Sequence, residues 1–157
     1  VPSRTGVNIA PETYLELSKH QNIVAAKEAN GNISSLAKSI SLCGENLDFY
    51  SGNDDQIVPI LSLGGIGVIS VFSNVCPREC HEIVENYLNG NCKESLHLQL
   101  KYLNLIENLF CDVNPVPVKE AMNLMKFSCG NCRLPLGTLS ESNLEKLKSE
   151  MKRLNLI

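Results

Sequence analysis

The chain has 157 residues and a formal net charge of −3, a size that suits one compact domain. Its hydrophobic fraction of 43% is enough for a packed core and argues against a disordered protein. The acidic balance argues against a surface that binds nucleic acid. No apolar run approaches the ~20 residues that a membrane span needs, so we expect no membrane partner.

Two features of the chain bear on its context. The first residues, Val1 to Arg4, resemble the end of a strand followed by a turn, so we expect the chain to be a piece of something longer. Seven cysteines at irregular spacing, in a sequence that shows no signal peptide, predict reduced thiols and a cytoplasmic location. The C-x-x-C at Cys129 and Cys132 could be redox-active or half of a zinc site. A metal site would need it to converge with Cys76 and Cys80, which nothing in the sequence indicates.

Short apolar runs alternate with helical patterns over the first two-thirds of the chain. We expect helices over 11–20, 33–44, 57–64 and 77–88, and strands over 23–29, 47–51 and 66–72. The run IGVISVF at 66–72 is nearly all apolar, as in a parallel strand that is covered on both faces. This series predicts an α/β fold with a parallel sheet, at a spacing that suits (β/α) barrel units. The glycine fingerprint of a dinucleotide-binding sheet is absent.

After Asn91 the pattern becomes entirely helical. We expect helices over 92–110 and 117–125, and a last one with Leu144, Leu147, Met151 and Leu154 on its packed face, started by a capping box at Ser142 and Glu145. The sequence therefore predicts half of a (β/α)8 barrel over residues 1–91 and a helical region over 92–157. A complete barrel takes about 250 residues, and only three full strands and the end of a fourth are expected here. Half a barrel leaves its edge strands unpaired, so the isolated chain should not be the whole functional unit.

Lys27 is the main candidate for chemistry, because it stands near the carboxyl end of an apolar strand, where barrel active sites are built. Alternation places Ile23, Ala25 and Ala29 on the face of Lys27, and Val24, Ala26 and Glu28 on the other. Burial lowers the pKa of a lysine, and a neutral amine can form a Schiff base with a ketone. The alternative is a lysine whose stem packs in the strand while its head reaches solvent. For Glu28 we expect a structural hydrogen-bonding role.

Six further residues lie at expected strand ends. The guanidinium group of Arg4 could hold a carboxylate through two parallel hydrogen bonds. The alternative is an ordinary surface arginine, which is the default in a loop. Gly52 would let a substrate approach the backbone, and Ile69 with Ser70 would line the pocket. For Asn53 and Asp54 helix capping is the preferred role.

Several segments together resemble the dihydrodipicolinate synthase family. They are VPSRTG (1–6), IVAAKEANGN (23–32), YSGNDD (50–55), LGGIGVISVFSNVCP (63–77), NPVPVKEAM (114–122) and RLP (133–135). The resemblance covers essentially the whole chain, but only the C-terminal half of that enzyme. It implies a (β/α)8 barrel with a helical extension, which condenses pyruvate with L-aspartate 4-semialdehyde to 4-hydroxy-tetrahydrodipicolinate in lysine biosynthesis.

The resemblance also assigns roles to residues. It implies that Lys27 forms the Schiff base with pyruvate, without a metal or organic cofactor, and that Arg4 meets the carboxylate of the semialdehyde. It implies that the backbone of Ile69 contacts pyruvate and that Gly52 lines the pocket. The family is usually dimeric or tetrameric, so a homo-oligomer is expected.

The family's tyrosine proton donor precedes this chain. Its pyruvate-binding threonines, a tyrosine from a neighbouring subunit and most of its lysine feedback site belong to the N-terminal half. Each proton transfer is worth about 10²–10⁴-fold in rate, so we expect the chain alone to be inactive or nearly so. Two alternatives stay open: a related pyruvate aldolase, such as N-acetylneuraminate lyase or a keto-deoxy-sugar aldolase, and a non-catalytic half-barrel.

Overall fold

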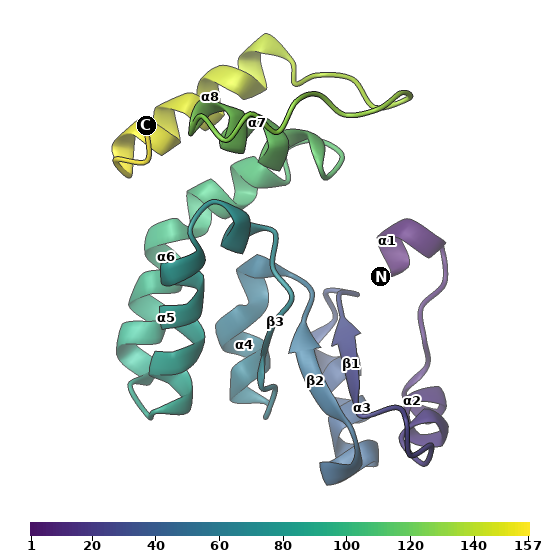
Figure 1. Cartoon of the computed structure of the whole chain (residues 1–157). Coiled ribbons are helices and arrows are strands. Elements are labelled where there is room, and N and C mark those ends of the chain that lie inside the picture. The colour runs from purple at the N-terminus through teal and green to yellow at the C-terminus, as the bar shows by residue number, and fades with distance from the viewer.

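The structure is a computed structural model that describes residues 1–157. From α2 to α5 its helices and strands alternate, and helices alone follow (Figure 1). The elements are α1 (Pro2–Thr5), α2 (Pro11–Leu17), β1 (Ala25–Glu28), α3 (Ile33–Cys43), β2 (Asp48–Ser51), α4 (Ile57–Ser62), β3 (Gly67–Val68), α5 (Pro77–Leu88), α6 (Cys92–Leu109), α7 (Val116–Leu124) and α8 (Glu141–Arg153). Three 3-10 turns lie at Gly44–Asn46, Asp54–Gln56 and Phe72–Asn74. None of the helices combines the length and apolar character that crossing a bilayer requires.

The three strands form one parallel sheet in the order β1-β2-β3. Lys27 pairs with Tyr50, and Tyr50 pairs with Gly67. The strands point toward the end of the molecule where α7 and α8 lie (Figure 1). This arrangement confirms the predicted parallel sheet and is consistent with part of a (β/α) barrel.

Two apolar clusters hold the sheet and helices together. The smaller one packs α2 and α3 against β1 and β2, with Tyr14 and Phe49 edge to face at 5.6 Å between ring centroids. The larger one joins α4 and α5 to the three C-terminal helices. Leu147 and Met151 on α8 are fully buried in it, which confirms that the leucine-rich face of the last helix is core packing. The core therefore continues from residues 1–91 into 92–157.

A buried glutamine ties the C-terminal helices to the carboxyl end of β2. Gln99 on α6 is 3% exposed. Its Nε2 donates to the carbonyl of Asp54 at 2.9 Å, and its Oε1 accepts from the backbone N–H of Val58 at 2.8 Å. Because Val58 lies in the first turn of α4, this side chain satisfies a backbone donor that the helix itself leaves free.

The structure corrects the prediction at both ends of the sheet. Residues 2–5 are not the end of a strand but the helical turn α1, which is followed by Gly6 with φ of 69°. Proline at the first helical position and glycine after the last favour this turn. The end of a fourth strand is therefore absent from the sheet.

The expected strand at 66–72 is regular only at Gly67–Val68. One backbone hydrogen bond on each side extends its contact with β2. The N–H of Ile66 donates to Phe49 O, and the N–H of Ile69 donates to Ser51 O. Beyond Ile69 the chain leaves the sheet, because the carboxylate of Asp54 accepts the next backbone donors.

Local starts of two other elements also differ from expectation. The side chain that caps α8 is Ser140, which accepts from the N–H of Asn143 at 3.3 Å, so the expected box at Ser142 and Glu145 is wrong. Regular strand β1 begins only at Ala25. Before it the alternation is broken, so Ile23 packs against the smaller core and Val24 is 68% exposed.

Candidate functional site

Lys27 lies on the face of the sheet that no helix covers, which we call the open face. From Ala25 onward the strand alternates, with Ala25 and Lys27 exposed and Glu28 buried. The predicted orientation of Lys27 away from the helices is therefore confirmed. The burial that its apolar run predicts is not found, because Lys27 is exposed.

Glu28 points into the helix layer and holds the end of β1. Its Oε2 accepts from the Tyr14 hydroxyl at 2.7 Å, and its Oε1 accepts from the N–H groups of Ala29 and Asn30, both at 2.7 Å. Burial, followed by the hydrogen bond to Glu28, raises the pKa of Tyr14 well above its usual range. The structural hydrogen-bonding role expected for Glu28 is confirmed, and it fixes the direction of the neighbouring Lys27.

Gly52 lies where the side chain of Lys27 crosses β2. A Cβ atom on Gly52 would meet Lys27 Cε at 2.8 Å and Ala29 Cβ at 2.6 Å, closer than non-bonded carbons approach. The expected close approach at this glycine is thus made by the lysine of the same chain. The missing side chain lets Lys27 lie along the sheet.

Ile69 is on the same face and at the same end of the sheet. Its N–H donates to Ser51 O at 2.8 Å, its side chain is 49% exposed, and its carbonyl accepts no hydrogen bond within the chain. An unpaired carbonyl at the carboxyl end of a barrel-type strand is a ready acceptor for a ligand.

Arg4 comes near a residue that we did not single out from the sequence. Its Nη2 donates to the backbone carbonyl of Asn114 at 3.4 Å, across 110 residues of chain. The Oδ1 of Asn114 is buried and has no hydrogen-bond partner. Arg4 and Asn114 therefore bring a guanidinium and a free amide oxygen together, and no local pattern could have indicated the pair.

Asp54 does not cap a helix as expected. Asn53 occupies the position before the 3-10 turn, but neither its side chain nor that of Asp54 caps the turn. Asp54 is 1% exposed, and its Oδ2 accepts from Val71 N–H at 3.0 Å and Phe72 N–H at 2.9 Å. It ties the segment after β3 to the segment after β2.

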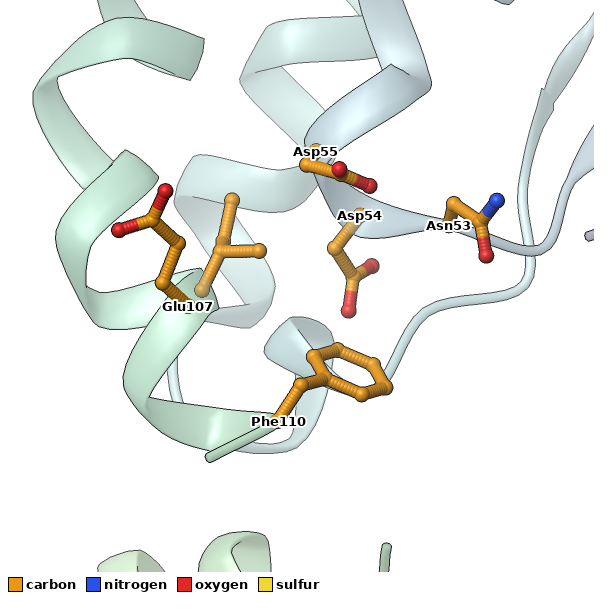
Figure 2. A pocket seen from close by; sticks show the side chains of 6 residues that line it. Asn53, Asp54, Asp55, Glu107 and Phe110 are labelled. Carbon is orange, nitrogen blue, oxygen red and sulfur yellow. The ribbon is translucent and has the colours of Figure 1, made fainter. Parts of the chain in front are cut away.

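Beside these residues a pocket of about 280 Å³ opens between the end of β2 and the end of α6. Figure 2 shows the carboxyl groups of Asp54, Asp55 and Glu107 around it, with the ring of Phe110 below. Lys27 does not line it. All seven cysteines are free thiols, and the two cysteine pairs do not converge, since no group of three or more His, Cys, Asp or Glu side chains could hold a metal ion.

Residues 1–154 match the family model described as "Dihydrodipicolinate synthetase family". The chain belongs to this family. A 4-hydroxy-tetrahydrodipicolinate synthase of Caldicellulosiruptor saccharolyticus is 59% identical over 151 residues, which are 96% of this chain and 51% of the relative. The Clostridium perfringens enzyme of the same name (strain SM101) is 55% identical over 157 residues, all of this chain and 54% of the relative.

Solved structures of the family have the same fold. The dihydrodipicolinate synthase of Thermotoga maritima matches with a TM-score of 0.96 at 40% identity, over 100% of this chain and 55% of that one. Another is described as the first monomeric dihydrodipicolinate synthase variant, with a TM-score of 0.94 at 40% identity over 100% of this chain and 54% of that one. The chain thus spans about half the length of the dihydrodipicolinate synthases that it matches.

Proposed function

We propose that this chain is the C-terminal half of a (β/α)8 barrel that condenses pyruvate with L-aspartate 4-semialdehyde, with Lys27 as the nucleophile. The observation that carries the proposal is Lys27 on the open face, laid across Gly52 at the carboxyl end of a parallel sheet. Family membership and the half-length match support it. The division into a half-barrel over 1–91 and a helical region over 92–157 is part of this proposal.

The chemistry starts at the amine of Lys27. Its Nζ attacks the C2 carbonyl of pyruvate, the oxygen leaves as water, and an imine remains. Loss of a proton from the methyl carbon gives an enamine, which attacks the aldehyde carbon of the second substrate. This chain supplies the nucleophile, and the other half of the barrel would bury it and supply the proton donor.

Two other parts of the site would hold the substrates. The free carbonyl of Ile69 lies at the same end of the sheet as Lys27, where it can accept a hydrogen bond from bound pyruvate or its adduct. The guanidinium of Arg4 suits the carboxylate of the semialdehyde.

The isolated chain should be inactive or nearly so. Its open face leaves Lys27 in solvent, and the outer edges of β1 and β3 have no partner strand in the sheet. We propose that the partner covering this face is the N-terminal half of the barrel, and that complete barrels assemble as a homo-oligomer. Free thiols throughout agree with a cytoplasmic enzyme.

The test is borohydride trapping of the pyruvate imine, followed by intact mass and peptide mapping. One sample is the 157-residue chain, and the other, the completed barrel, joins the N-terminal half of the Clostridium perfringens relative to Val1. We expect an adduct on Lys27 in the completed barrel and little or none in the chain alone. A completed barrel that folds but traps no pyruvate would refute the proposal.

The alternatives have their own readouts. A completed barrel that cleaves sugar acids faster than it condenses the semialdehyde would indicate a related pyruvate aldolase. A completed barrel that folds but forms no imine, together with self-association of the isolated chain, would indicate a non-catalytic half-barrel. Light scattering measures that association, which the exposed Val24 and Ile69 favour.

A further inference from the structure

Asp54 is a buried carboxylate that the proposed chemistry does not use. It is 1% exposed, and burial raises the pKa of its carboxyl group, although the Ser70 hydroxyl and the N–H groups of Phe72 and Val71 oppose that rise. Its Oδ1 has no hydrogen-bond partner of good geometry. Burying a charge whose hydrogen bonds are incomplete costs free energy. A functional role of this carboxylate would offset that cost.

The backbone that Asp54 holds begins at Val71, two residues after Ile69. On one side Ile69 is fixed by its N–H bond to Ser51 O. On the other side the Asp54 carboxylate binds the N–H groups of Val71 and Phe72. The peptide group between Ile69 and Ser70 is therefore held on both sides. It contains the Ile69 carbonyl, which accepts no hydrogen bond within the chain.

Asp54 is itself fixed from outside the sheet. Gln99 on α6 donates to the Asp54 carbonyl at 2.9 Å, so the helical region sets where the carboxylate stands. Figure 2 shows the Asp54 side chain pointing away from the ribbon of residues 53–55, between that turn and Phe110. The carboxylate thus holds the loop after β3 in a fixed position through two hydrogen bonds.

We propose that Asp54 is a positioning residue, whose carboxylate holds the loop at Val71 and Phe72 so that the carbonyl of Ile69 faces pyruvate bound at Lys27. This inference rests on the proposed function and deepens it. Asp54 acts on the substrate only through the Ile69 backbone. Its loss should weaken the use of pyruvate even where the barrel stays folded.

The experiment compares three variants of the completed barrel with the unsubstituted one. Asp54→Ala removes the acceptor, Asp54→Asn keeps an oxygen for the two N–H groups, and Leu147→Ala opens a cavity in the core at α8, without changing the carboxylate. The pyruvate dependence of borohydride trapping on Lys27 is measured per folded molecule, with folding followed by circular dichroism. For Asp54→Ala we expect about a tenfold slower trapping, as a displaced contact group would cause, and a higher half-saturating pyruvate concentration.

The control variants decide what a loss means. Asp54→Asn should recover most of the rate, and Leu147→Ala should leave the half-saturating pyruvate concentration unchanged. Equal trapping by Asp54→Ala and the unsubstituted barrel would overturn the inference, and so would an equal loss in Leu147→Ala. Failure of the proposed function looks different, because then the unsubstituted completed barrel itself traps no pyruvate.

Discussion

Replacing Gly52 with alanine should displace the nucleophile while leaving the fold intact. The new Cβ would stand 2.8 Å from Lys27 Cε and 2.6 Å from Ala29 Cβ, whereas ordinary contact begins at 3.4 Å. The lysine side chain must therefore move by about 0.6 Å and the strand by about 0.8 Å to relieve the overlap. A misplacement of the reacting group by ~1 Å costs about 100-fold in rate. Overpacking of this size costs about 1–3 kcal/mol of stability, which a complete barrel tolerates.

The assay is the rate of pyruvate trapping on Lys27 in the completed barrel, together with the rate of condensation. The matched control is Gly137→Ala, since a Cβ atom there meets nothing within 4 Å. Both variants should show the same circular dichroism, and only Gly52→Ala should lose trapping. If the two variants trap pyruvate equally fast, the idea that Lys27 needs the space at Gly52 is wrong.

Three further predictions test the buried polar groups. Burial, with smaller effects from Glu79 and Cys80, raises the pKa of Cys76 to about 12, so at pH 8 only about one thiol in 10⁴ is a thiolate. Iodoacetamide should therefore label the exposed Cys92 long before Cys76, and equal labelling by peptide mapping would contradict this. Tyr14→Phe should lower the free energy of unfolding by about 1–3 kcal/mol, because Glu28 Oε2 loses its buried donor; an unchanged urea midpoint would count against it. The raised pKa of Asp54 means that its contribution to stability is fully present below the ordinary value of 3.8 and is lost as pH rises through the folded value. Asp54→Asn should thus gain stability relative to the parent above that pH, measured by urea unfolding across pH, and a constant difference would refute the sign.

The strand positions of the site could be predicted because they depend on local pattern. The apolar run around Lys27, the glycine after β2 and the apolar run before Ile69 predict three parallel strands whose carboxyl ends meet at one edge. Glu28 was assigned correctly for the same reason, since alternation alone places it opposite Lys27.

The remaining features depend on contacts between distant segments. Arg4 meets Asn114 across 110 residues, and Asp54 serves a loop 17 and 18 residues further on, so neither contact leaves a trace in local periodicity. The exposure of Lys27 agrees with the alternative in which its head reaches solvent, and the apolar run alone does not decide between that alternative and a buried amine.

The buried Glu28 beside the exposed Lys27 also determines the alignment of β1. Ala25 and Ala26 differ little in size or polarity from one face to the other, so they cannot select a register. A shift of one residue would turn Lys27 toward Phe49 and the helices, and would release Glu28 from the Tyr14 hydroxyl and the two backbone donors. The contacts of Glu28 thus select one register for β1. In that register the amine of Lys27, and not the carboxylate of Glu28, lies on the open face.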